Sequence, residues 1–157
     1  MTFQIRRATV DDVGQLLVIE EAQFPEPWTR NMLLDELTNE ATRRYTVAVS
    51  ADLIIGYLGL MYVMDDEMHI NTIGTRPGHE GRGIARALLD DGFADARERG
   101  VQRATLEVRV SGTRAQRLYH HYGFAPVGIR KNYYEKTKED ALIMWAELND
   151  VTPETGS

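Results

Sequence analysis

A glycine-rich loop is the segment whose residue types and spacing point most directly to chemistry. It reads Glu80-Gly-Arg-Gly-Ile-Ala-Arg86 and opens a segment with helical hydrophobic spacing. Such loops suit phosphates, because glycine lets a backbone approach closely and the first N–H groups of a helix are unpaired. The Gly-Lys-Ser/Thr of a Walker loop is absent, and Arg86 stands where a dinucleotide fingerprint needs a small residue. The loop therefore predicts either an anion site over 81–85, helped by Arg82 and Arg86, or a plain tight turn.

The chain has four histidines, which matter because imidazole titrates near neutral pH. His69 lies near the start of a predicted strand and is the histidine best placed to act as a base. His79 precedes the glycine-rich loop, where it could face a phosphate, and His120 and His121 are expected at the surface of a helix. No spacing of His, Asp or Glu side chains is typical of a metal site.

Hydrophobic periodicity predicts the elements that must position these residues. The expected strands cover residues 3–7, 45–49, 53–62, 68–75, 104–110, 124–133 and 141–148, and the expected helices follow Thr9, Thr29, Gly83 and Gly112. A run of hairpin strands followed by a β-loop-α-β unit implies an α/β (α+β) fold. We expect a mixed central sheet of about seven strands flanked by about four helices.

Composition limits the class of protein. Lys and Arg total 18 and Asp and Glu total 24, so the formal net charge is −6 and no direct nucleic-acid partner is expected. No apolar run approaches the roughly 20 residues that span a bilayer, so no membrane partner is expected. The first residues lack the apolar stretch of a signal peptide, which favours a cytoplasmic protein. We expect it to be a monomer or a weak dimer.

The length of 157 residues is typical of one domain. We expect a single domain over 1–149 and a disordered tail over 150–157, because the tail is polar, contains Pro and Gly and has no apolar period. Cysteine is absent, which excludes disulfides, thiolate metal sites and a cysteine-linked acyl intermediate.

Several motifs resemble those of the GNAT family, the acetyl-coenzyme A-dependent N-acetyltransferases. The family's pyrophosphate loop reads Gln/Arg-x-x-Gly-x-Gly/Ala, and residues 80–85 are similar to it except at Glu80. Within the family, the chain most resembles the RimI-type ribosomal-protein-alanine N-acetyltransferases. The segments with that resemblance are Leu106–Gly112, Leu118–Phe124 (Leu-Tyr-His-His-Tyr-Gly-Phe), Arg130–Tyr134 (Arg-Lys-Asn-Tyr-Tyr) and Glu139–Met144. The resemblance runs from about residue 3 to residue 148 and implies the GNAT fold.

The resemblance implies that acetyl-coenzyme A is the co-substrate and that no metal takes part. In the family, one strand pairs with the pantetheine arm and the loop holds the pyrophosphate. The residues expected to contact the donor are Ile73, Gly74, Thr75, Gly81, Arg82, Gly83, Ile84, Ala85, Arg86 and Gly112. Gly74 would either let the ligand lie close or leave room for packing or a bulge. Two positions depart from the family pattern, namely Glu80, which we expect to point to solvent, and Gly112, where the RimI type has Asn.

The resemblance also makes Glu107 the general base and Tyr119 the general acid for direct attack of an amine on the bound thioester. From the residues alone, Glu107 would be an exposed strand carboxylate or a partner of Arg109, and Tyr119 would be a core tyrosine. A glutamate at its reference pKa is about 3.5 units too acidic to deprotonate an α-ammonium group, a gap of about 5 kcal/mol. We therefore expect a raised pKa for Glu107 or a water between it and the amine. His69 is the rival base.

In the family, the acceptor cleft is flanked by the segments that contain Trp28, Glu67, Tyr133 and Tyr134. The resemblance implies a protein N-terminus as acceptor, with the N-terminal alanine of a small-subunit ribosomal protein as the expected one. An acidic enzyme would suit an acceptor followed by basic residues. Otherwise these residues are a packed indole, a solvated acidic turn and ordinary strand aromatics. The open alternatives are acetylation of a lysine or a small-molecule amine, and a non-catalytic module that binds acetyl-coenzyme A.

Overall fold

A mixed sheet between two layers of helices makes up residues 2–148, the part of the chain described by the computed structural model. The strands are β1 (Gln4–Arg7), β2 (Arg43–Ser50), β3 (Leu53–Val63), β4 (Glu67–Thr75), β5 (Arg103–Arg109), β6 (Ala125–Tyr134) and β7 (Glu139–Glu147). The helices are α1 (Val13–Gln23), preceded by the 3-10 helix η1 (Val10–Asp12), α2 (Arg30–Thr38), α3 (Ile84–Glu98) and α4 (Thr113–His121). The expected mixed α/β architecture is confirmed, while the predicted tail over 150–157 lies outside the described residues.

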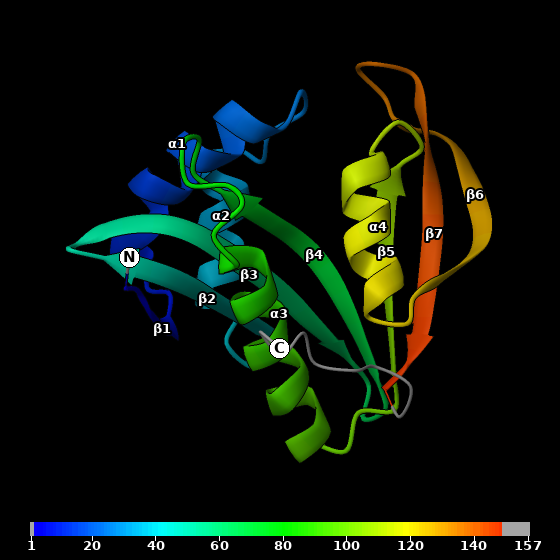
Figure 1. Ribbon diagram of the computed structural model, residues 1–157, viewed down its shortest axis with the longest axis horizontal. Coiled ribbons are helices and arrows are strands. Elements are labelled where there is room, and N and C mark those ends of the chain that lie inside the picture. The colour runs from blue at the N-terminus through cyan, green and yellow to red at the C-terminus, as the bar shows by residue number, and fades with distance from the viewer. Residues whose placement is uncertain (1, 149–157) are drawn as a thin grey trace.

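The sheet has the strand order β1-β2-β3-β4-β5-β7-β6. Neighbouring strands of the described chain are antiparallel except β4 and β5, which are parallel. Their register joins Glu67 to Arg103, Met68 to Ala104 and His69 to Thr105, and no further pair follows among the described residues. Beyond these pairs the two ribbons diverge (Figure 1). The sheet is therefore open in its middle, at the carboxyl ends of two parallel strands.

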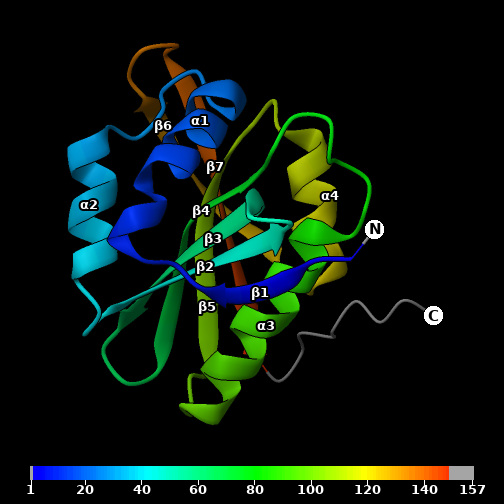
Figure 2. The same ribbon diagram turned by 90° about the vertical axis from the view of Figure 1, so that its left-hand side faces the viewer.

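The helices lie on opposite faces of the sheet, with α1 and α2 on one face and α3 and α4 on the other (Figure 2). The hydrophobic core has a matching division. One cluster packs between the sheet and α3 and α4, and the other packs between the sheet and α1 and α2. No helix among residues 2–148 is both long enough and apolar enough to cross a membrane.

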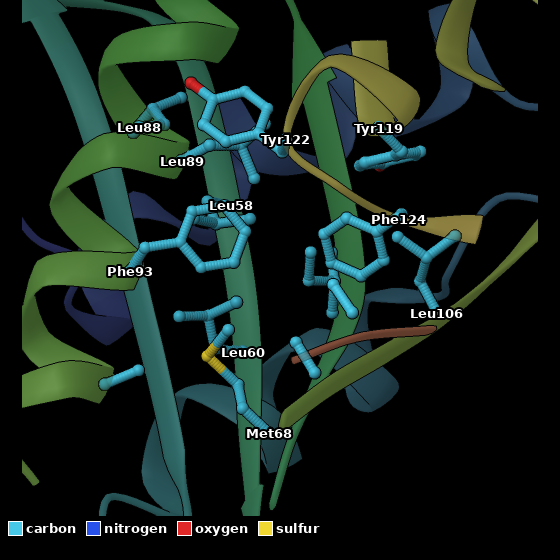
Figure 3. Close-up of a cluster of buried hydrophobic side chains, with 14 of the residues drawn as sticks. Leu58, Leu60, Met68, Leu88, Leu89, Phe93, Leu106, Tyr119, Tyr122 and Phe124 are labelled. Atoms are coloured by element: carbon cyan, nitrogen blue, oxygen red, sulfur yellow. The ribbon is translucent and has the colours of Figure 1, made fainter. Parts of the chain in front are cut away.

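Aromatic contacts join α3, which packs on β3 and β4, to the end of α4 and the residues just after it. The ring centroid of Phe93 on α3 lies 5.3 Å from that of Tyr122 and 6.1 Å from that of Phe124. The Tyr122 hydroxyl also donates to the Asp90 carboxylate at 2.8 Å. Figure 3 shows the Phe93 ring beside Leu58, with the Tyr122 ring above it and the Phe124 ring to its right. Phe93 therefore connects the two halves of the molecule on either side of the opening.

Replacing Phe93 tests this connection. Phe93 is 1% exposed, so Phe93→Ala should lower the free energy of unfolding by about 3–5 kcal/mol through lost burial and a residual cavity. Val127→Ala is the control, because Val127 is 59% exposed and its truncation should change stability by less than about 0.5 kcal/mol. Urea unfolding measures both. Equal effects of the two substitutions would contradict this account of the core.

Candidate active site

A cavity of about 300 Å³ lies where β4 and β5 part. Its walls come from α1 and the segment after it, from β4 and β5, from α4 and from the end of β6. Six of the residues predicted for the site line it, namely Trp28, Ile73, Glu107, Gly112, Tyr119 and Tyr134. The parting of the strands therefore brings the expected base, acid and acceptor-side aromatics to one place.

A second cavity, of about 640 Å³, adjoins the first on the side of α2 and the β6–β7 turn. Trp28 and Tyr134 line both cavities, and Tyr133 lines the second, with its ring edge-on to Tyr134 at 5.1 Å. Glu67 lines neither of these two cavities. It lies at the paired end of β4, where its carboxylate is 3.5 Å from Arg103 Nε. The structure thus gathers three of the four predicted acceptor residues and places Glu67 apart from them.

Glu26, which the sequence reasoning missed, also lines both cavities. Its carboxylate accepts hydrogen bonds from the backbone N–H groups of Lys136 and Thr137, and it lies 3.9 Å from Arg109. The Arg109 guanidinium stacks over the Tyr134 ring at 3.8 Å. These contacts hold the segment after α1 against the β6–β7 turn. The prolines on both sides of Glu26 were a signal, because they restrict the backbone that presents it.

Glu107 faces away from the core, as the strand alternation predicts, since Leu106 and Val108 are buried on the opposite face. Its side chain is only 14% exposed, and Arg109 pairs with Glu139 instead of with Glu107. Glu107 Oε2 lies 2.5 Å from His69 Nε2, and Oε1 accepts from Arg130 at 3.1 Å. The hydrogen bond to His69 is the largest cause that lowers the pKa of Glu107, so the first of the two expectations, a raised pKa, was wrong, and a water between Glu107 and the amine stays a prediction.

His69 is the group with which Glu107 shares a proton. Burial alone would lower the pKa of His69, but hydrogen bonds to Glu107 and Asn71 outweigh it, and the pKa of His69 is raised. The pair therefore favours an imidazolium beside a carboxylate. Its contribution to stability is lost as the pH rises through the raised pKa of His69 or falls through the lowered pKa of Glu107. The rival base and the expected base are thus one hydrogen-bonded unit.

Tyr119 is both a core residue and a lining residue of the cavity. Its side chain is 5% exposed, and its ring packs edge-on against Phe124 at 5.7 Å. Burial raises the pKa of Tyr119 well above its ordinary value. The phenol therefore keeps its proton at neutral pH, as a proton donor must.

The glycine-rich loop ends at the N-terminus of α3. Gly81 and Gly83 both have φ of 76°, and a Cβ at either would meet nothing within 4 Å, so the backbone conformation is what requires glycine there. Gly83 is the N-cap of α3 and provides no side-chain cap. The first N–H groups of a 15-residue helix thus lack a side-chain cap at an exposed loop, which fits the pyrophosphate of an anionic donor.

The other donor-side residues lie around this helix start and the opening. Ile84 belongs to the core, so its backbone alone faces the loop, while Ala85 is half-buried and Arg82 and Arg86 are exposed. Glu80 is exposed, as expected, and accepts a hydrogen bond from Gly78 N at 2.9 Å.

Two further glycines follow different constraints. A Cβ on Gly74 would lie 2.8 Å from Tyr57 and 3.0 Å from Ile19, so packing is sufficient to require this glycine, and its contact with the donor stays a prediction. Gly74 and its neighbours Ile73 and Thr75 still lie on the part of β4 that has left β5. Gly112 is the N-cap of α4, without a side-chain cap.

Comparison with known proteins decides the family. The model of the Acetyltransferase (GNAT) family matches residues 13–124. The chain belongs to the GNAT family. It is an acetyl-coenzyme A-dependent N-acetyltransferase.

Individual relatives agree with this assignment. The GNAT chain is 36% identical over 146 residues to a Bacillus subtilis protein provisionally named a [ribosomal protein bS18]-alanine N-acetyltransferase, with 93% of this chain and 96% of that protein covered. It is 31% identical over 128 residues to the enzyme of that name from Escherichia coli, with 80% and 84% covered. The crystal structure of the Escherichia coli enzyme superimposes with a TM-score of 0.85 at 26% identity, covering 94% of each chain. PaiA N-acetyltransferase of Thermoplasma acidophilum, solved with coenzyme A, shares the fold at 15% identity and a TM-score of 0.77, covering 94% of this chain and 99% of that one.

Glu20 is a second buried carboxyl group of this GNAT site that the sequence reasoning missed. It is 1% exposed and lines the first cavity. One oxygen accepts from Trp28 N at 3.1 Å, and the other accepts from the Thr72 hydroxyl at 3.4 Å. Burial is the largest influence and raises the pKa of Glu20 to about 7. Glu20 thus connects the segment after α1 to β4. Ionisation of its buried carboxyl group lowers the free energy of unfolding.

The pH dependence of stability tests this description of Glu20. An ordinary glutamate in the unfolded chain loses its proton near pH ~4.3, so stability falls as the pH rises from there through about 7, by about 2–3 kcal/mol between pH 5 and 8. Glu20→Gln should remove that loss, because the amide does not ionise. The measurement is urea unfolding at both pH values.

Glu21→Gln is the matched control, one residue further along α1 on an exposed side chain. It should leave the wild-type pH dependence intact. A Glu20→Gln variant with the same pH dependence as the wild type would refute the raised pKa.

Proposed function

We propose that this GNAT enzyme acetylates the α-amino group of a protein N-terminus, specifically the N-terminal alanine of a ribosomal protein of the bS18 type in the cytoplasm. The names of the relatives at 31–36% identity support this acceptor. The observation on which the proposal mainly rests is that Glu107, paired with His69, and Tyr119 line one cavity at the parting of β4 and β5.

The chemistry begins with removal of a proton from the acceptor. Acetyl-coenzyme A supplies a thioester carbonyl when bound. An α-ammonium group titrates near pH ~8 and a lysine near ~10.4, so an N-terminus is far easier to deprotonate. The His69–Glu107 pair takes up that proton, directly or through a water, in the form that has lost its own shared proton. The raised pKa of His69 brings the pKa of the accepting group closer to that of the α-ammonium group than the pKa of Glu107 alone would be.

Bond formation then needs an acid on the other side of the cavity. The neutral amine forms the new C–N bond, the C–S bond breaks, and Tyr119 gives its proton to the departing sulfur. The new amide nitrogen still carries an extra proton. It releases this proton to the Tyr119 phenolate, which restores the phenol. One ammonium and one thioester give one amide, one thiol and one proton, which leaves from the His69–Glu107 pair.

The acceptor side fits a positively charged N-terminus. The segment of the acceptor nearest the site would lie among Trp28, Tyr133 and Tyr134, with the Glu26 carboxylate between the two cavities. Aromatic rings bind an apolar side chain such as that of alanine, and the carboxylate attracts the ammonium group. The acidic net charge of −6 suits basic residues further along the acceptor.

The test is release of the coenzyme A thiol with a panel of amines. An alanine-initiated basic peptide should be acetylated at its α-amino group, and the same peptide with a blocked N-terminus should give no release. The Glu107→Gln variant should lower kcat by about 10²-fold or more at neutral pH, with little change in the peptide KM, because a lost base acts on the transition state.

The other outcomes separate the remaining functions. Faster turnover with a lysine side chain or a small polyamine than with the peptide would overturn the proposed acceptor. Near-full turnover by Glu107→Gln would overturn the base role. Binding of acetyl-coenzyme A without release for any amine would make the protein a binding module.

A further inference from the structure

A chain of side-chain hydrogen bonds runs from α2 to the His69–Glu107 pair. It starts at Glu36, which is 8% exposed. Glu36 Oε1 accepts from Asn71 Nδ2 at 2.8 Å and from the Tyr45 hydroxyl at 2.7 Å, and Oε2 accepts from Arg43 Nε at 2.7 Å. Asn71 Oδ1 then lies 2.5 Å from His69 Nδ1. The mechanism above uses neither Glu36 nor Asn71, although they are joined to its base.

Glu36 fixes the direction of every hydrogen bond in this chain. A carboxylate paired with Arg43 only accepts hydrogen bonds, so Asn71 must turn its NH2 group toward Glu36. Turning the amide around would place two oxygen atoms 2.8 Å apart. The Asn71 oxygen is therefore left for His69, whose Nδ1 must carry a hydrogen.

The hydrogen on Nδ1 decides what Nε2, the other ring nitrogen of His69, can do. With a hydrogen on Nδ1, a neutral His69 presents a lone pair at Nε2 to a carboxylate oxygen of Glu107 at 2.5 Å, so two acceptors would face each other. One proton between them removes that conflict. The pair thus binds a single proton strongly, and that proton lies between His69 Nε2 and the Glu107 carboxylate.

We propose that Asn71 and Glu36 are positioning residues that hold His69 in its Nδ1–H form and so make the His69–Glu107 pair a one-proton acceptor. The inference rests on the proposed function for its catalytic meaning, but the hydrogen-bond order itself concerns the free enzyme. Glu36 lines neither of the two cavities, Asn71 lines the first one, and we assign no proton transfer to either residue. Asn71 acts on the base through His69, and Glu36 acts through Asn71.

The charged and titratable groups around His69 are consistent with a pair that keeps its proton. Those that face it or its direct partners, from α2 and from strands β2, β4, β5 and β6, are Glu36, Arg43, Tyr45, Glu67, Glu107, Arg130 and Tyr133. The Glu107 and Glu67 carboxylates favour the imidazolium, while Arg130 favours the ionised form of Glu107.

The experiment is 15N NMR of the histidine ring nitrogens in the free, full-length enzyme, followed by pH titration. Wild-type His69 should titrate above the ordinary value of about 6.5 and should carry its hydrogen on Nδ1 once neutral. In Glu36→Gln, the new amide can donate to Asn71, which frees the Asn71 amide to turn around. The Nε2–H form should then appear, and the pKa of His69 should fall by about half a unit or more.

Two further variants keep the test decisive. Asn71→Ala removes the acceptor at Nδ1 while leaving the contacts of Glu36 with Arg43 and Tyr45, and it should shift His69 in the same direction. Asp12→Asn is the matched control, because Asp12 is equally buried at 8% and paired with Arg6 at 2.8 Å outside the chain of hydrogen bonds. It should leave the titration of His69 unchanged.

The outcomes distinguish the inference from the proposed function. Wild-type tautomer and titration in both Glu36→Gln and Asn71→Ala would overturn the inference, as would a neutral wild-type His69 with its hydrogen on Nε2. With an active peptide substrate, the acid limb of kcat/KM in Glu36→Gln should move to lower pH by the same amount as the pKa of His69. An acid limb of kcat/KM that stays at its wild-type pH would overturn the proposed role of Glu36 and Asn71 in catalysis. Failure to acetylate any amine would overturn the proposed function alone, because the NMR result needs no substrate.

Discussion

The parallel pairing of β4 with β5 lasts for three residue pairs, and the whole site depends on where it ends. Backbone N–H and C=O groups at a strand edge need partners, so two strands that part offer hydrogen bonds to an extended ligand between them. β4 and β5 stay apart because each strand packs in a different half of the molecule. β4 packs with β3 and α3, β5 pairs with β7, and the aromatic contacts of Phe93 join the halves on the face of α3 and α4.

The electrostatics of the opening follow from the same geometry. His69 belongs to the last shared pair of the two strands, opposite Thr105, and Glu107 lies two residues beyond Thr105 on β5, which places an imidazole against a carboxylate at 2.5 Å. Their pKa values move apart, with that of His69 raised and that of Glu107 lowered. Tyr119 keeps its proton because its phenol is buried. Glu107 and Tyr119, which we propose as members of the proton acceptor and as the proton donor, thus line one cavity, and acetyl transfer to an amine requires both functions.

Local patterns in the sequence predicted the frame of the molecule, while the resemblance to the GNAT family was what pointed to Glu107 and Tyr119 as the proposed base and acid. Strand alternation placed Glu107 opposite Leu106, and helix caps and glycines located the starts and ends of the helices. Long-range contacts were beyond such patterns. Glu36 and Asn71 are 35 positions apart, and their contact joins α2 to β4. His69 and Glu107 are 38 positions apart, and their contact depends on the register of β4 with β5. The alternation of β4 did put His69 and Asn71 on one face, which was the available signal. Gly74 was ambiguous for the same reason, since only the packed structure shows Tyr57 and Ile19 against it.

A crystal structure of the enzyme with bound coenzyme A tests the central claim most directly. We expect the pantetheine arm to lie between β4 and β5 along Ile73–Thr75, with the pyrophosphate at the backbone of residues 81–85 and the sulfur near Tyr119. Coenzyme A bound away from the parting of these strands, or with its sulfur far from both Tyr119 and Glu107, would contradict it.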